Sequence, residues 1–188
     1  MANKTTVPLT QEQYVNIITA MRTGGVSFRP NERIATALIL EANLGIRIQN
    51  ILRLRLQDII QDGTRYRINI EEVKTNKKRT FTVPTEVYQF LKIYCLERGI
   101  RPDEIIFQIT TRAVEQYLAK VCDYLGYENI GTHSFRKYFA TEIYNNNDHD
   151  VVIVNRLLQH SSLANTQRYL GVESPVIERA LKKHVRLP

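Results

Sequence analysis

The sequence predicts a mainly helical α+β domain with one small three-stranded antiparallel sheet, because its apolar side chains change period twice. They recur at helical spacing up to residue 52, follow a strand-like pattern from residue 56 to residue 84, and then return to helical spacing. Apolar residues make up 43% and charged residues 24% of the 188 positions. These ordinary fractions indicate one globular domain that is long enough to bury a substantial core.

Capping residues and glycines mark the expected helices. We expect residues 1–8 to form a flexible arm. Thr10 and Gln13 then make a capping-box pattern, which predicts a helix that ends at Gly24. Further helices are expected at 30–45, from 47 onward, and at 85–96, 112–125, 132–144, 149–158 and 174–184.

Three short strands are expected between the helical parts. Their segments read L-Q-D-I-I-Q-D-G, T-R-Y-R-I-N-I-E-E-V and R-T-F-T-V-P. Asp62 and Gly63 fit a hairpin turn between the first two strands, and the basic stretch 74–78 fits a second turn. These segments predict an antiparallel meander.

The net charge of +7 favours a polyanionic partner, with nucleic acid first and an anionic membrane surface second. Cys95 and Cys122 lie in helix-like patterns without metal-ligand spacing, so we expect buried thiols in a reducing compartment. The most apolar run, residues 34–46, contains Glu41 and is too short to span a bilayer. No signal-peptide core follows Met1, so we expect a soluble, cytoplasmic protein with no membrane partner.

The last third of the chain, residues 132–171, contains a dense set of reactive side chains. It reads T-H-S-F-R-K-Y-F-A-T and later L-L-Q-H-S-S-L-A-N-T-Q-R-Y-L-G. If Thr132 caps a helix, His133 and Arg136 stack on one face of it. Apolar side chains four residues apart should anchor the adjoining face in the core: Phe135, Phe139 and Ile143. We expect His133 and Arg136 to look out along the edge of this packed stripe.

His160 and Tyr169 complete this set. An arginine fork suits two phosphate oxygens, a histidine exchanges a proton near neutral pH, and a tyrosine hydroxyl can attack phosphorus. Taken singly, such residues usually belong to solvated faces or packing. Their order and spacing together are what favour phosphoryl-transfer chemistry.

The order H-x-x-R, L-L-x-H-S-S and T-x-x-Y resembles the tyrosine recombinases, also called the phage integrase family. Arg47, in N-L-G-I-R-I-Q-N-I-L, resembles that family's first catalytic arginine. The alternative is a basic face that Arg47 shares with Arg53 and Arg55. The glycine before Arg47 favours the first reading, because it puts the arginine at a helix N-terminus.

Lys74, in E-V-K-T-N-K-K-R-T-F, resembles the hairpin lysine of the family. The interval from Lys74 to Pro84 is longer than the family's pattern, so Lys77 and Lys78 are alternatives. The resemblance then extends over residues 10–169.

The resemblance implies a site-specific recombinase or integrase that cuts and rejoins DNA strands through a 3′-phosphotyrosyl intermediate, without ATP, metal or any other cofactor. The implied catalytic residues are Arg47, Lys74, His133, Arg136, His160 and the nucleophile Tyr169. We further expect basic side chains to contact DNA at Arg53, Arg55, Lys77, Lys78, Arg79 and Lys137.

The implied partners are double-stranded DNA and further copies of the chain, as a homo-oligomer that is a tetramer on paired sites. We expect residues 9–173 to form the catalytic domain. Residues 174–188 would form a tail helix, which docks either on a neighbouring protomer or on its own domain. Family members commonly carry a separate DNA-clamping domain before the catalytic one, so the chain is either a fragment or a short member.

Three positions depart from the family's pattern. Gln159 replaces a glycine, Lys137 a histidine and Asn50 an acidic residue. Two alternatives to recombination also remain, namely a type IB topoisomerase and a DNA-binding regulator that keeps the fold without cleaving. Because all the catalytic positions hold competent residues, the regulator is the less favoured of the two.

Overall fold

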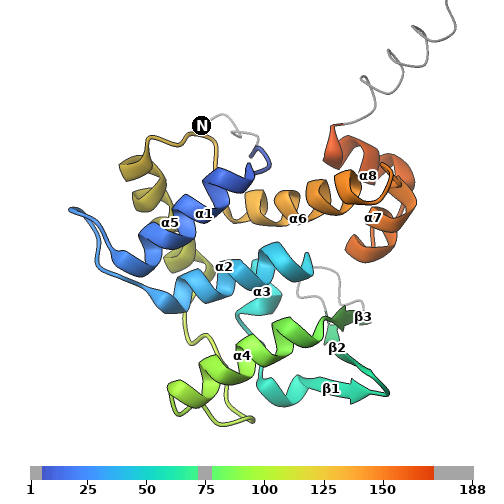
Figure 1. Ribbon diagram of the computed structural model, residues 1–188, viewed down its shortest axis with the longest axis horizontal. Coiled ribbons are helices and arrows are strands. Elements are labelled where there is room, and N and C mark those ends of the chain that lie inside the picture. The colour runs from blue at the N-terminus through green and yellow to red at the C-terminus, as the bar shows by residue number, and fades with distance from the viewer. Residues whose placement is uncertain (1–5, 72–77, 172–188) are drawn as a thin grey trace, which may run out of the picture. The chain divides into compact units, whose positions relative to one another are not determined.

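The computed structural model describes residues 6–71 and 78–171. The chain divides into two compact units, Met1–Phe139 and Ala140–Pro188, with the boundary inside one helix. The first unit contains, in order, α1 (Gln11–Thr23), α2 (Glu32–Leu44), α3 (Ile48–Ile51), the 3-10 helix η1 (Leu56–Asp58), β1 (Ile59–Asp62), β2 (Arg65–Glu71), β3 (Lys78–Val83), α4 (Thr85–Glu97), α5 (Thr111–Leu125) and the first part of α6 (Thr132–Asn146) (Figure 1). The second unit contains the end of α6, α7 (Val151–Leu158) and α8 (Leu163–Leu170). The mainly helical α+β class is therefore confirmed.

Capping residues define the ends of the first two helices. Gln13 N–H donates to Thr10 Oγ1 at 3.1 Å, and Thr10 N–H donates to Gln13 Oε1 at 3.0 Å, so the capping box before α1 is confirmed. Asn31 rather than Pro30 caps α2, through its Oδ1 and the Ile34 N–H. Gly45 ends α2 in the left-handed region, where a side chain would be strained.

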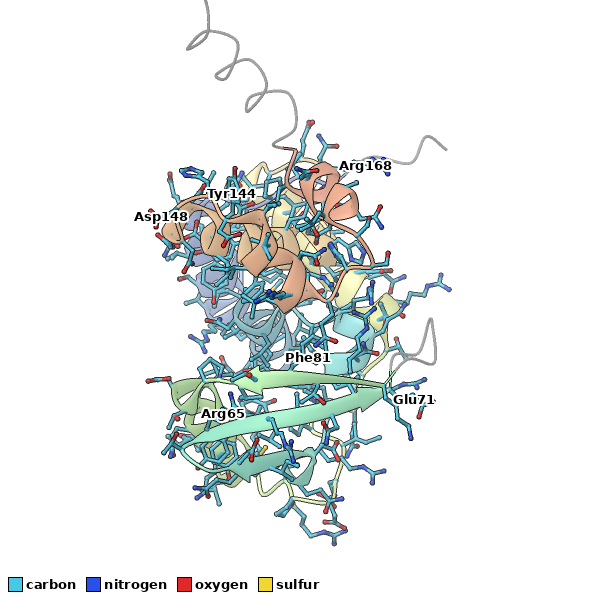
Figure 2. The ribbon with its side chains drawn as sticks, turned by 90° about the vertical axis from the view of Figure 1, so that its right-hand side faces the viewer. Arg65, Glu71, Phe81, Tyr144, Asp148 and Arg168 are labelled. Atoms are coloured by element: carbon cyan, nitrogen blue, oxygen red, sulfur yellow. The ribbon has the colours of Figure 1, made fainter. Side chains whose placement is uncertain are left out.

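The sheet has the expected order β1-β2-β3, and both pairs of strands are antiparallel. Asp62 pairs with Arg65 across the first turn, and Glu71 pairs with Lys78 across the second. Figure 2 labels Arg65 and Glu71 near the two ends of β2. The turn residues 72–77, which include Lys74 and Lys77, lie outside the described residues.

The segment before β1 differs from the expectation of a strand. Leu56–Asp58 form the 3-10 helix η1, because the Asp58 carboxylate accepts the Arg55 N–H at 2.9 Å and tightens the chain into a turn.

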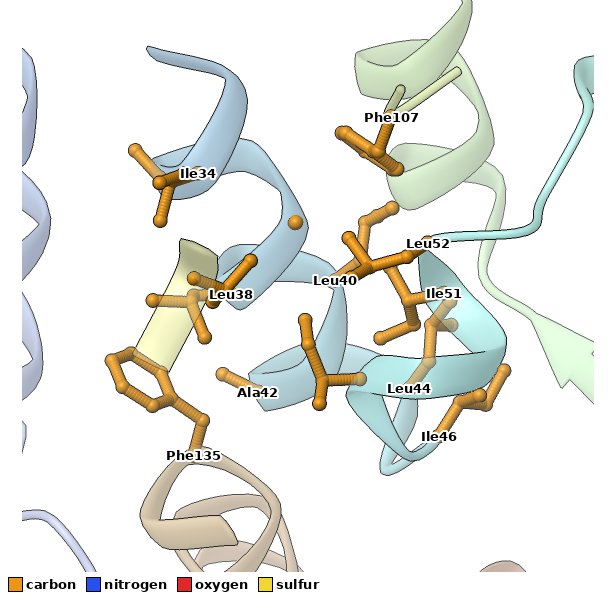
Figure 3. Packing of buried hydrophobic residues seen from close by; sticks show 14 of the residues in the cluster. Ile34, Leu38, Leu40, Ala42, Leu44, Ile46, Ile51, Leu52, Phe107 and Phe135 are labelled. Carbon is orange, nitrogen blue, oxygen red and sulfur yellow. The ribbon is translucent and has the colours of Figure 1, made fainter. Parts of the chain in front are cut away.

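Helix α2 lies inside the core of the first unit. It contacts α1 and α3 and also reaches β3, while α4 contacts β2 (Figure 1). Figure 3 shows Leu38 and Leu40 of α2 among buried apolar side chains, with the Phe135 ring from α6 on the side of Leu38. Phe135 is fully buried, whereas Phe139 and Ile143 are only half-buried, so the expected anchoring stripe of α6 is correct at its first member.

The helices of the last third of the chain differ in detail from the sequence analysis. Thr132 is the first residue of α6 rather than its cap, and Ser134 Oγ accepts the Gly131 N–H before it. Helix α7 begins at Val151 instead of residue 149, because the Asp150 carboxylate caps its first N–H groups. Helix α8 was not expected, because its sequence L-A-N-T-Q-R-Y-L offers too few apolar residues to show a helical period.

The described residues stop short of both ends of the chain. The expected tail helix and residues 1–5 of the expected arm lie outside the described residues. Next to them, the Val7 N–H donates to the Asn129 carbonyl at 3.2 Å, and the Thr6 carbonyl accepts a hydrogen bond from Lys137. Across the described ranges, no helix combines the length and the apolar character needed to cross a membrane.

Glu41 of α2 places a carboxyl group inside the core of the first unit. The side chain is 0% exposed, and its Oε1 accepts the Ile48 N–H at 3.1 Å, which joins α2 to the start of α3. Burial raises the pKa of Glu41 well above its usual value, although the Ile48 N–H and the charge of Arg136 act in the opposite direction. The folded state therefore holds the Glu41 proton more tightly than the unfolded chain does.

We expect Glu41→Gln to change how stability depends on pH. The unfolded chain releases the Glu41 proton near its ordinary pKa of about 4.3, whereas the folded chain keeps it to higher pH. The contribution of Glu41 is therefore fully present below the unfolded pKa and is lost as pH rises towards the folded one. Glutamine still accepts the Ile48 N–H but cannot titrate. The variant should gain free energy of unfolding relative to the wild type as pH rises, as measured by urea denaturation from about pH 5 to about pH 8.

The matched control is Glu32→Gln on the same helix, where the carboxylate forms an exposed ion pair with Arg22 at 2.9 Å. This change should show no such trend. An identical pH dependence for Glu41→Gln and the wild type would contradict the raised pKa.

Candidate active site

Arg47 occupies the turn between α2 and α3, at the position that precedes the first residue of α3. The left-handed Gly45 ends α2 two residues earlier, and the buried Ile48 and Ile51 anchor α3 on the other side. The side chain of Arg47 is half-buried. The chain therefore holds this guanidinium at a short, well-packed corner, as the glycine break predicted.

Glu41 links this corner to α6. Its carboxyl accepts the N–H of the residue that follows Arg47, and it interacts electrostatically with Arg136. Sequence reasoning did not assign a role to Glu41. The signal was present, because a lone acidic residue inside the most apolar run of a chain needs a buried partner.

Helix α6 carries His133 and Arg136, and their environments differ. His133 is exposed, whereas Arg136 is only 3% exposed. The expectation that both look out from the edge of the packed stripe is therefore wrong for Arg136. Its neighbours on the helix, Phe135 and Tyr138, are buried in the core and draw this turn of α6 inward.

His160 and Tyr169 come together in the second unit. His160 directly follows the residue that ends α7, and Tyr169 lies in the last turn of α8. The two ring centroids are 5.2 Å apart with the rings at 80°, an edge-to-face arrangement. The Tyr169 hydroxyl oxygen is buried. The two residues therefore form one compact pair.

The His160 ring has a second neighbour on α8. Its Nδ1 lies 3.0 Å from the Thr166 hydroxyl oxygen, and Thr166 is fully buried on α8. Thr166 is the threonine of the T-x-x-Y motif, and the sequence alone indicated no separate role for it. The hydrogen bond to His160 identifies a structural reason for that threonine.

Gln159 explains one departure from the family's pattern. It ends α7 in the left-handed region, at φ 53° and ψ 43°, where glycine is the unstrained residue. A residue with a Cβ costs roughly 1–2 kcal/mol in this conformation. Gln159 thus keeps the backbone geometry that a glycine would adopt before His160. Asn50, a second departure, is buried at 5% exposure on α3.

The predicted DNA-contacting residues have mixed surroundings. Arg53, Arg55 and Lys78 are exposed, and Arg79 is half-buried on β3. Lys137 is half-buried, and its ammonium donates to the Thr6 carbonyl, so this side chain also ties the N-terminal segment to α6.

Within residues 6–71 and 78–171, no three His, Cys, Asp or Glu side chains cluster as metal ligands would. Both cysteines are buried, and burial raises the pKa of Cys122 to about 12. Their expected role as apolar fillers agrees with this burial.

Comparison with known proteins identifies relatives by sequence. The model of the phage integrase family matches residues 8–174. The probable integrase/recombinase YoeC of Bacillus subtilis (strain 168) is 29% identical over 160 residues, which cover 81% of this chain and 84% of YoeC. Tyrosine recombinase XerC of Leptospira interrogans serogroup Icterohaemorrhagiae serovar copenhageni (strain Fiocruz L1-130) is 30% identical over 148 residues, which cover 74% of this chain and 46% of XerC. The chain thus spans less than half of that XerC.

Solved structures share the fold. XerH site-specific recombinase, in a post-cleavage complex with a palindromic difH substrate, superposes with a TM-score of 0.72 at 21% identity, over 96% of this chain and 53% of XerH. The catalytic domain of bacteriophage HP1 integrase gives 0.65 at 16% identity, over 95% of each chain. At these identities the likeness establishes the fold alone. Together with the sequence match over residues 8–174, it shows that the chain belongs to the phage integrase family of tyrosine recombinases.

Proposed function

We propose that this chain is a site-specific DNA recombinase that cuts and rejoins DNA strands through a covalent bond to Tyr169. The observation that carries the proposal is the pairing of Tyr169 with His160, with ring centroids 5.2 Å apart and a buried phenol oxygen. A phenol held beside an imidazole that is itself held in place suits a nucleophile that must be aimed.

In the proposed reaction, a bond forms between the Tyr169 oxygen and phosphorus while the bond from phosphorus to the 5′ oxygen breaks. A free phenol has a pKa of about 10, so the attack requires removal of its proton. We assign this proton to His133. The product is a 3′-phosphotyrosyl link and a free 5′ hydroxyl.

The nonbridging phosphate oxygens need donors as charge builds in the transition state. Arg47, Arg136 and His160 are the proposed donors. One preorganised donor of this kind is typically worth on the order of 3–4 kcal/mol. The burial of Arg136 supports its role, because a guanidinium that has already lost most of its water interacts more strongly with an arriving phosphate.

Lys74 is the proposed acid for the departing 5′ oxygen, with Lys77 and Lys78 as the alternatives. The link to tyrosine conserves the phosphodiester energy, so a 5′ hydroxyl from another strand can reverse the step. The proposed reaction thus needs neither ATP nor a metal ion.

Double-stranded DNA and further copies of the chain are the proposed partners. The solved XerH relative is bound to its DNA substrate, and we propose double-stranded DNA as the partner here, contacted by exposed basic residues such as Arg53, Arg55 and Lys78. We also propose a tetramer on paired sites, in the cytoplasm where the DNA is accessible. The tail 174–188 would dock either on a neighbouring protomer or on its own domain.

Trapping the covalent intermediate tests the proposed function. Nicked duplexes with a randomised centre are incubated with the full chain, and protein–DNA adducts are isolated under denaturing conditions. A recombinase should enrich one sequence, joined to Tyr169 as located by peptide mass spectrometry. The absence of any adduct would contradict the function. Relaxation of a supercoiled plasmid that lacks the enriched sequence would favour a type IB topoisomerase instead.

Tyr169→Phe should abolish adduct formation and leave DNA affinity within about twofold of the wild type. The change removes one hydroxyl, whereas affinity comes from many phosphate contacts to Lys and Arg. Denaturing gels measure the adduct, and a mobility-shift assay measures affinity. Tyr124→Phe, at an exposed tyrosine of α5, is the matched control and should form adducts normally. Adducts that persist in Tyr169→Phe would remove Tyr169 as the nucleophile.

A substrate with sulfur in place of the bridging 5′ oxygen tests the proposed acid. An oxygen leaving group departs as a strong base, like hydroxide from water, and benefits greatly from an acid. A thiolate, whose conjugate acid has a pKa of about 8.5, departs without help. Lys74→Ala should therefore cleave the ordinary duplex poorly and the sulfur duplex at nearly the wild-type rate.

Lys77→Ala and Lys78→Ala are compared in the same assay, and Arg136→Ala should gain no comparable rescue. If sulfur rescues one of the other lysine variants and not Lys74→Ala, the acid is that other lysine.

A further inference from the structure

A short chain of hydrogen bonds runs from Asn155 on α7 through Thr166 on α8 to His160. Asn155 Nδ2 donates to Thr166 Oγ1 at 2.9 Å, and Thr166 Oγ1 lies 3.0 Å from His160 Nδ1. Thr166 is 0% exposed, so its hydroxyl cannot exchange these partners for bulk water. All three residues belong to the second unit.

The orientation of the Asn155 amide follows from its other neighbours. The same nitrogen lies 2.9 Å from the Ser162 carbonyl oxygen and 3.4 Å from the His160 carbonyl oxygen. A carbonyl can only accept, so the atom that faces both of them must be the NH₂ group and not the amide oxygen. Asn155 is therefore a donor to the Thr166 hydroxyl.

This donor determines which way the Thr166 hydrogen points. A hydroxyl has one hydrogen to donate, and a buried donor left unsatisfied costs about 1–3 kcal/mol. Asn155 is itself donating, so it cannot receive this hydrogen. Among the residues that the structure describes, the remaining polar atom within hydrogen-bond distance of Thr166 Oγ1 is His160 Nδ1. The hydroxyl hydrogen therefore points at Nδ1, which accepts it.

We propose that Thr166, oriented by Asn155, is a positioning residue that fixes the tautomer of His160, with Nδ1 as the acceptor and the proton on Nε2. This proposal deepens the proposed function and rests on it for the role of His160 towards DNA. With its proton on Nε2, a neutral His160 donates a hydrogen bond to a phosphate oxygen. The opposite tautomer would present a lone pair there and repel that oxygen.

The tautomer can be read directly by NMR, whether or not the chain cleaves DNA. The full chain is labelled with ¹⁵N at its four histidines, and the His160 signals are assigned by their absence from His160→Gln. Two-bond ¹H–¹⁵N correlation spectra, recorded at a pH where the ring is neutral, distinguish a protonated Nε2 from a protonated Nδ1. The wild type should show Nε2–H and an unprotonated Nδ1. A wild-type ring with Nδ1–H would overturn the proposal.

Thr166→Val removes the hydroxyl and keeps the volume of the side chain, whereas Thr166→Ser restores the hydroxyl. The valine variant should lose the pure Nε2–H signature, and the serine variant should regain it. If the valine variant keeps the wild-type tautomer, Thr166 does not set it. Thr141→Val, a threonine on the second-unit part of α6, is the matched control and should leave the signature unchanged.

The effect on function is tested by measuring how fast each variant cleaves the duplex recovered in the trapping experiment. Changing a residue that orients a working histidine typically lowers activity about ten- to a hundredfold, and we expect that loss for Thr166→Val with recovery in Thr166→Ser. If the wild type cleaves the duplex and Thr166→Val cleaves it at the same rate, Thr166 has no positioning role. If the wild type forms no adduct at all, the proposed function fails, while the NMR result still decides whether Thr166 fixes the tautomer.

Discussion

The first unit must accommodate the guanidinium of Arg136 at a position that is almost inaccessible to water, and this constraint shapes the rest of the unit. Arg136 is 3% exposed, and a buried charge costs several kcal/mol unless something compensates it. Glu41 attracts it, but burial raises the pKa of that carboxyl, so Glu41 holds its proton more readily than a surface glutamate and offsets less of the charge. A phosphate group is a partner that a buried guanidinium can bind strongly through charge-assisted hydrogen bonds. The proposed catalytic role of Arg136 follows from its burial as much as from its place in a motif.

The Glu41 carboxyl group also connects Arg136 to Arg47, the other candidate catalytic arginine of the first unit. Glu41 accepts the Ile48 N–H, and Ile48 directly follows Arg47. One buried side chain of α2 therefore acts on both the corner that carries Arg47 and the helix turn that carries Arg136. The apolar packing around α2 keeps that side chain in place, so the same helix stabilises the core of the first unit and the positions of Arg47 and Arg136.

Much of this arrangement could be predicted because the signals are local. Thr10 with Gln13, Gly45 and the alternation in β2 each act within a few residues, and each produced the expected element. Helix α8 could not be predicted in this way, because Thr166 is its one buried side chain and no apolar period exists to detect. The lone acidic residue in an apolar run was visible, but its partners Ile48 and Arg136 could not be predicted, since they lie seven and more positions away. The order of the motif residues indicated the family, while their burial and hydrogen bonds required the structure.

Helix α8 shows why a polar anchor suits the proposed nucleophile. Eight residues are too few for a helix to be stable alone, and α8 buries no apolar side chain to compensate. It is instead held at its start by the Ser162 hydroxyl, which accepts the Asn165 N–H at 3.2 Å, and along its length by Thr166. The hydrogen bond between Thr166 and His160 therefore stabilises α8 as well as orienting the imidazole. Because Tyr169 lies one turn further along α8, the contact that sets the histidine also sets the position of the phenol. This shared anchor keeps the imidazole and the phenol close together, which suits the proposed action of both on a single phosphorus atom.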